Sequence, residues 1–201
     1  MNHNKIGWNF PGRYDKELRK YGLDIAHYLS GEGKRVLDLG CSVGIETARI
    51  AAQNPRHYFV GMDTEPDRIG IAKSGAWYVR RDVANYGVGG DVGWDENSFP
   101  DVFDFLEQHS FGMDPGLFPM VLRRNKLPNL EYIEGDYDHP QLGQVPFDVA
   151  AAFFCGLKAD SHDSIQSVMR LLRPGGILLT TWAELHKTGP GSYEEVSFAR
   201  R

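Results

Sequence analysis

Residues 36–44 decide the fold that this sequence predicts, and they read Val36-Leu37-Asp38-Leu39-Gly40-Cys41-Ser42-Val43-Gly44. The apolar run over 35–39 predicts a short buried strand, the glycines mark a tight turn, and the apolar spacing of 45–53 predicts a helix. Such a turn lets backbone N–H groups and a helix N-terminus face a bound ligand. Asp63 follows about 20 residues later, where an acidic side chain accepts hydrogen bonds from ribose hydroxyl groups. The stretch therefore predicts a nucleoside-binding strand–turn–helix unit.

The rest of the chain alternates between expected strands and helices. Beyond this unit we predict helices over 15–30, 66–73, 118–126 and 164–172. We predict strands over 57–62, 130–133, 147–154 and 176–182, and a short final hairpin of 182–187 with 193–199. Alternating strands and helices indicate βαβ units with right-handed crossovers. The expected fold class is α/β: a doubly wound, Rossmann-like, mostly parallel sheet in a single domain over 1–201, with a shortened C-terminal hairpin.

Residues 74–117 interrupt this alternation with many glycines and aromatic side chains. A stretch of this kind inside a compact domain is often a functional lid, and its aromatic content favours an ordered one. We expect one short helix in it, over 101–109. Residues 1–30 are expected to form an N-terminal lid and helix.

Composition excludes several classes of protein. The chain has 201 residues and a formal net charge of −5, so a dedicated nucleic-acid partner is not expected. No apolar run approaches the roughly 20 residues that a membrane span needs. Cys41 and Cys155 form no CxxC pair and no metal-ligand cluster is visible, so we predict neither a metal site nor a disulfide. The polar N-terminus lacks a signal core, and we expect a cytoplasmic protein.

The glycine turn does not read GxGxxG, which counts against NAD and FAD. It resembles the first motif of class I S-adenosylmethionine-dependent methyltransferases, Asp-Leu-Gly-x-Gly-x-Gly, with Ser42 at the middle glycine. We expect serine to be tolerated there if it avoids a positive φ. Three further segments, 59–63, 130–136 and 171–179, resemble later motifs in the order of that family.

The resemblance implies S-adenosylmethionine as the cofactor. It does not cover 1–30 and 74–117, and it implies that these two segments carry the acceptor site. Under it, the turn presents its backbone to the methionyl and ribose parts of the cofactor through Gly40, Cys41, Ser42 and Gly44. Asp38 orients this turn or reaches the amino group through water; otherwise it is a turn-stabilising carboxylate. Asp63 binds the ribose hydroxyl groups, caps the helix that begins at Pro66, or does both.

At the adenine end, the resemblance implies contacts from Thr64, Asp136 and Tyr137. The alternative for Asp136 is an ordinary turn carboxylate that follows a strand. Phe154 lies where the fourth strand ends, close to the reactive methyl group, with core packing as its alternative.

The catalytic candidates are Tyr14 and His162. Tyr14 offers an aromatic face that suits a sulfonium cation, but ordinary packing explains a single aromatic residue more readily. His162 follows the fourth strand and is the candidate general base, but members of the resembled family often carry a histidine near this place without a catalytic duty.

The leading interpretation is transfer of the cofactor's methyl group to an oxygen or nitrogen of a small molecule. Two alternatives stay open. One is a cyclase or aminoalkyl transferase that uses the aminocarboxypropyl arm and releases methylthioadenosine; the other is a non-catalytic binding subunit. A protein amine as acceptor and a homodimer are both compatible with the sequence. The Asn/Asp-Pro-Pro-aromatic motif is absent from the fourth strand, which disfavours methylation of DNA bases.

Overall fold

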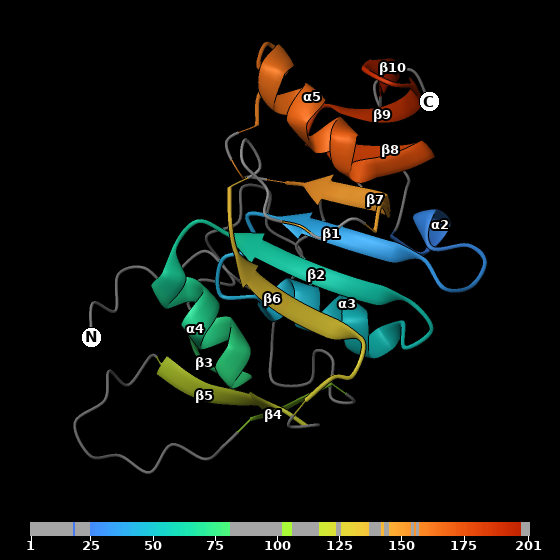
Figure 1. Ribbon diagram of the computed structural model, residues 1–201. Coiled ribbons are helices and arrows are strands. Elements are labelled where there is room, and N and C mark those ends of the chain that lie inside the picture. Colours follow the sequence, from blue (N-terminus) through green and yellow to red (C-terminus); the bar gives the residue numbers. More distant parts are fainter. Residues whose placement is uncertain are drawn as a thin grey trace.

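The computed structural model describes residues 18, 25–80, 102–105, 117–123, 126–136, 142, 145–153, 155 and 157–197. Its main feature is a seven-stranded sheet in the order β10-β9-β8-β7-β1-β2-β6 (Figure 1). The strands are β1 Arg35–Leu39, β2 Tyr58–Asp63, β6 Leu130–Glu134, β7 Phe147–Ala152, β8 Leu172–Thr180, β9 Ala183–Gly189 and β10 Ser192–Ser197.

Parallel pairing joins the first five of these strands in the chain. β1 lies between β2 and β7, β6 pairs with β2, and β8 pairs with β7, all in parallel. β9 and β10 are antiparallel and form a hairpin at one edge of the sheet. The predictions of an α/β, mostly parallel sheet and of a short final hairpin are therefore confirmed.

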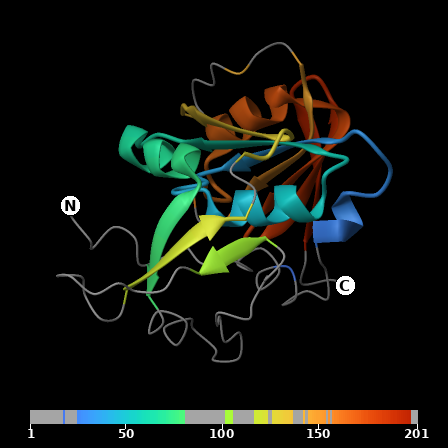
Figure 2. The same ribbon diagram turned by 90° about the horizontal axis from the view of Figure 1, so that it is seen from below.

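Helices cover both faces of this sheet, with α3 on one side of the strands and α5 on the other (Figure 2). The helices are α2 Ile25–Tyr28, α3 Ile45–Gln53, α4 Pro66–Ser74 and α5 His162–Leu171. α3 has the predicted bounds, and α4 and α5 differ from theirs by one or two residues. Of the expected helix over 15–30, the structure describes Leu18, which is helical, and α2. Within the described ranges, no helix is long and apolar enough to cross a membrane.

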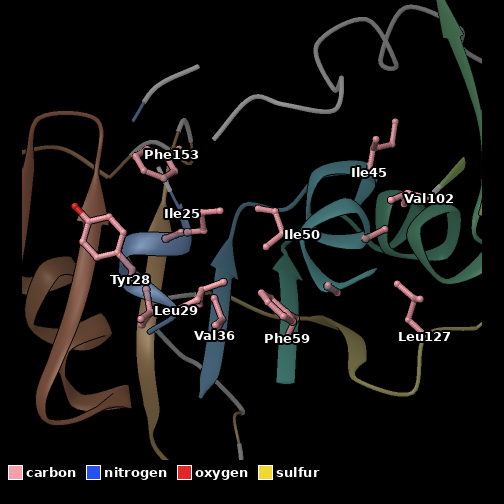
Figure 3. Close-up of a cluster of buried hydrophobic side chains, with 14 of the residues drawn as sticks. Ile25, Tyr28, Leu29, Val36, Ile45, Ile50, Phe59, Val102, Leu127 and Phe153 are labelled. Carbon is pink, nitrogen blue, oxygen red and sulfur yellow. The ribbon is translucent and has the colours of Figure 1, made fainter. Parts of the chain in front are cut away.

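One buried apolar cluster joins α2 and α3 to the sheet (Figure 3). Ile50 of α3 packs with Val36 and Phe59 from the neighbouring strands β1 and β2, and α2 contributes Ile25 and Tyr28. A second cluster on the other face packs α5 against the alternate residues of the same strands. This is the pattern of a sheet buried on both faces, and it explains why its central strands read as continuous apolar runs.

The predicted helices over 118–126 and 101–109 are wrong. β5 Leu117–Leu122 and β4 Phe103–Phe105 are strands, and with β3 Ala76–Arg80 they form a separate antiparallel sheet in the order β3-β5-β4. A short apolar run fits a strand as well as a helix. Pro119 lies opposite Tyr78 of β3, and β4 pairs only with 120–122, so the proline does not interrupt the pairing with β4. The inserted structure therefore begins directly after α4 and extends to Leu122.

Candidate functional site

The turn after β1 is built from residues with left-handed backbone. Gly40 has φ 69° and Gly44 has φ 76°, and Ser42 between them has φ 55°. A Cβ on Gly40 would lie 2.5 Å from Cβ of Cys155, so only glycine lets the chain after β7 approach so closely. The expectation that Ser42 avoids a positive φ is wrong. Ser42 adopts the left-handed backbone that suits the glycine of the family motif, and a residue with a side chain is strained in that conformation.

Hydrogen bonds from the turn dock it onto β2. The N–H groups of Gly40 and Cys41 both donate to the Met62 carbonyl, at 2.8 and 3.0 Å. The Ser42 N–H donates to Oδ2 of Asp63 at 2.8 Å. The Gly44 N–H donates to the Cys41 carbonyl at 2.9 Å. These four N–H groups thus fix the shape of the turn.

Backbone donors before and at the start of α3 are left over. The N–H groups of Val43 and Ile45 have no backbone acceptor among the residues that the structure describes. Gly44 is the N-cap of α3, and no side chain caps this helix. Both residues are buried, and unpaired N–H groups at a helix N-terminus attract negatively charged groups.

Asp63 is buried at the carboxyl end of β2, with 6% of its surface exposed. Besides Ser42, it accepts a hydrogen bond from the N–H of Glu65 at Oδ1, at 3.0 Å, and Nη1 of Arg68 lies 3.7 Å from the same oxygen. The N-cap of α4 is Glu65, so the alternative in which Asp63 caps that helix is wrong. Each carboxylate oxygen has two lone pairs, which leaves acceptor capacity for a ligand.

Asp38 supplies a second buried carboxylate, on β1. Its Oδ2 accepts a hydrogen bond from the hydroxyl of Thr47, one turn into α3. Burial and, to a smaller extent, the charges of Asp38 and Asp63 raise the pKa of the Cys41 thiol well above its usual value. Asp38 and Asp63 thus place two buried carboxylates beside the turn, and such groups favour a nearby cation.

Tyr132 of β6 closes the site from the side of the sheet. Its hydroxyl donates to the Gly44 carbonyl at 2.6 Å. A Cβ on Gly44 would lie 2.5 Å from its ring, and one on Gly61 of β2 would lie 2.7 Å from it. Burial raises the pKa of the Tyr132 phenol well above its usual value, so the hydroxyl stays a donor at neutral pH. Sequence reasoning missed Tyr132. Its signal is Gly61, which lies opposite Tyr132 on the neighbouring strand, together with Gly44 in the turn.

The other predicted site residues that the structure describes lie on the surface. Thr64 and Asp136 are exposed and follow β2 and β6, whose carboxyl ends are adjacent in the sheet. His162 is the exposed first residue of α5, and its ring lies 6.3 Å from the Tyr193 ring of the hairpin. Tyr14, Tyr137 and Phe154 lie outside the described residues.

Comparison with known families agrees with this geometry. A family model described as a methyltransferase domain matches residues 12–196. The chain belongs to this family. The match spans the glycine turn, Asp63 and the inserted sheet, and it confirms the resemblance found in the sequence. S-adenosylmethionine is accordingly the cofactor of the family, as predicted. A comparison with curated proteins returns no match.

Solved structures with a similar fold come from several microorganisms. A SAM-dependent methyltransferase from Methanosarcina mazei is 16% identical, with 79% of this chain and 56% of that chain covered and a TM-score of 0.46. YcgJ from Bacillus subtilis is 16% identical, with coverages of 81% and 49% and a TM-score of 0.47. PKMT2 from Rickettsia typhi in complex with AdoHcy is 16% identical, with coverages of 87% and 26% and a TM-score of 0.46. The chain spans about half the length of these proteins or less, and the similarity concerns the fold alone.

Proposed function

We propose that this protein is an S-adenosylmethionine-dependent methyltransferase that methylates an oxygen or nitrogen of a small molecule. The observation that carries the proposal is the bond between the Ser42 N–H and the Asp63 carboxylate. It joins the glycine turn to the acidic residue at the end of β2, which is the arrangement that binds a nucleoside in Rossmann-like sheets.

The charges of the site suit this cofactor. S-adenosylmethionine carries a sulfonium, an ammonium and a carboxylate group, and the buried carboxylates of Asp38 and Asp63 favour its two cationic groups. The Val43 and Ile45 N–H groups at the start of α3 suit its carboxylate. The remaining lone pairs of Asp63 would accept hydrogen bonds from the ribose hydroxyl groups, and Asp136 would stand at the adenine end.

When bound, the cofactor supplies a methyl group that is already activated by the sulfonium. Transfer of this methyl group to an O–H or N–H acceptor would release S-adenosylhomocysteine, and the proton of the acceptor would pass to solvent. The task of the protein is then to orient the two reactants and to exclude water. Docking of the turn onto β2 would hold the cofactor in a fixed orientation. We propose that segments 1–30 and 74–117 close over the acceptor and exclude water.

Product analysis tests this function. The protein is incubated with S-adenosylmethionine, first alone and then with mixtures of small phenols, carboxylic acids and amines, and the nucleoside products are followed by mass spectrometry. We expect S-adenosylhomocysteine only when an acceptor is present, and its loss in Asp63→Asn. Asp67→Asn is the matched control, because Asp67 is an exposed carboxylate on α4. Methylthioadenosine formed without an acceptor would contradict methyl transfer and favour chemistry on the aminocarboxypropyl arm.

A further inference from the structure

Trp77 connects the inserted sheet to the glycine turn. It lies on β3, 3% exposed, and its indole N–H donates to the Val43 carbonyl at 2.6 Å. Its ring belongs to the same buried cluster as Val43, Ile45 and Ala48 at the start of α3. The turn that the proposed function assigns to the cofactor is thus in direct contact with the segment assigned to the acceptor.

Trp77 and Tyr132 hold two consecutive peptide groups of the turn. Trp77 bonds the carbonyl of the Val43–Gly44 peptide, and Tyr132 bonds the carbonyl of the Gly44–Ile45 peptide. Because a peptide group is planar, a bond to its carbonyl also fixes the direction of the N–H at its other end. Tyr132 therefore fixes the direction of the Ile45 N–H, one of the donors left over at the start of α3. Trp77 fixes the neighbouring peptide from the other side.

The two donors come from different parts of the fold. Tyr132 belongs to the main sheet, whose strands are buried between helices. Trp77 belongs to the three-stranded sheet, which adjoins the rest of the molecule through α4 and the cluster around α3. A change in the turn on ligand binding would thus reach β3 through the hydrogen bond of Trp77 and the packing of its ring. By linkage, the position of β3 would change the affinity of the turn.

We propose that Trp77 is a positioning residue that couples occupancy of the cofactor turn to the order of the inserted sheet. This inference rests on the proposed function, because it takes the turn as the cofactor site. It implies that β3 and β5 are more rigid when the cofactor is bound than when it is absent. Binding of the cofactor before the acceptor is then favoured.

Hydrogen exchange with S-adenosylhomocysteine as the probe tests this coupling. In the wild-type protein, saturating S-adenosylhomocysteine should slow amide exchange in peptides covering 76–80 and 117–122 by about fivefold or more, the size of one hydrogen bond. Trp77→Phe keeps an aromatic ring and removes the N–H donor. This variant should still bind S-adenosylhomocysteine in calorimetry, but the slower exchange of the inserted sheet should disappear.

Tyr132→Phe is the matched variant, since it removes the equivalent donor from the main sheet. It should weaken binding of S-adenosylhomocysteine and still show slower exchange of β3 and β5 at saturation. Binding to the wild type with unchanged exchange at 76–80, or equal protection in Trp77→Phe, would overturn the coupling and leave the proposed function intact. Absence of any binding would overturn both. If Trp77→Phe does not fold, unchanged exchange of the wild-type protein on addition of S-adenosylhomocysteine still overturns the coupling.

Discussion

The backbone nitrogen of Ser42 lies 2.8 Å from Oδ2 of Asp63, and the hydrogen bond between them connects the turn after β1 to the end of β2. It holds Ser42 at φ 55°, a backbone conformation that costs a side-chain-bearing residue about 1–2 kcal/mol. Non-glycine residues keep such a conformation only where the surrounding structure imposes it. The strain at Ser42 is therefore located in the turn that we propose as the cofactor site.

Ser42→Gly should relieve this strain. Glycine adopts a positive φ without a steric cost but loses more freedom on folding, so we expect the free energy of unfolding to rise by about 0.5–1 kcal/mol. Urea denaturation measures this change. Ser42→Ala keeps the Cβ and should bring no gain; an equal gain in both variants would show that the backbone strain is not the cause.

Gly61→Ala should destabilise the protein because its Cβ would lie 2.7 Å from the Tyr132 ring, within a buried site. Overpacking of this kind costs about 1–3 kcal/mol. Gly70→Ala is the control: Gly70 lies inside α4, a Cβ added there would meet nothing within 4 Å, and alanine favours a helix by about 1 kcal/mol. Opposite shifts in melting temperature are the expected result, and a stable Gly61→Ala protein would contradict the packing of Tyr132.

Tyr28→Phe should weaken the attachment of α2 to the C-terminal hairpin. The Tyr28 hydroxyl donates a 2.9 Å bond to the buried carboxylate of Glu184 on β9. Loss of a buried bond to a charged group costs about 1–3 kcal/mol. Tyr58→Phe removes a similar bond to Glu131 that is exposed, and water can replace it there at little cost. Equal losses of unfolding free energy in the two variants would contradict the burial of the Glu184 site.

Stability should fall on mild acidification because of His57. Its Nδ1 accepts the Lys34 N–H, and burial, followed by the charge of Lys34, lowers the pKa of the imidazole below its ordinary value of about 6.5. The unfolded chain then binds a proton more readily than the native protein, so stability is present at neutral pH and is lost as the pH falls below about 6.5. Urea denaturation at pH 7 and pH 5 should show a smaller loss in His57→Gln than in the wild type. A loss of the same size would show that other groups cause it.

The local patterns of the sequence predicted the main sheet well. The strand over 35–39 and the helix over 45–53 were recognisable because apolar spacing, glycines and an acidic residue all indicate the same strand–turn–helix unit. The strand over 117–122 was mistaken for a helix because a short apolar run fits both structures, and pairing with 76–80 decides between them. That pairing joins residues about 40 positions apart, which no local pattern reports.

The contacts that shape the candidate site were also hidden from the sequence. The bond from Trp77 to Val43 spans 34 residues, and the bond from Tyr132 to Gly44 spans 88. Asp38 and Asp63 were found because short-range patterns mark them. Asp38 lies on the strand just before the glycine turn, and Asp63 ends the next strand. The positive φ of Ser42 was missed because it is imposed by a hydrogen bond to Asp63, which is 21 residues away.

The central claim is that the turn and Asp63 bind S-adenosylmethionine. Isothermal titration of S-adenosylmethionine into the wild-type protein and into Asp63→Asn tests it most directly, with thermal unfolding of both proteins as the check on folding. We expect binding to the wild type and a loss of about 1–3 kcal/mol of binding free energy in the folded variant. Equal affinity of the two folded proteins, or no binding to the wild type, would contradict the account.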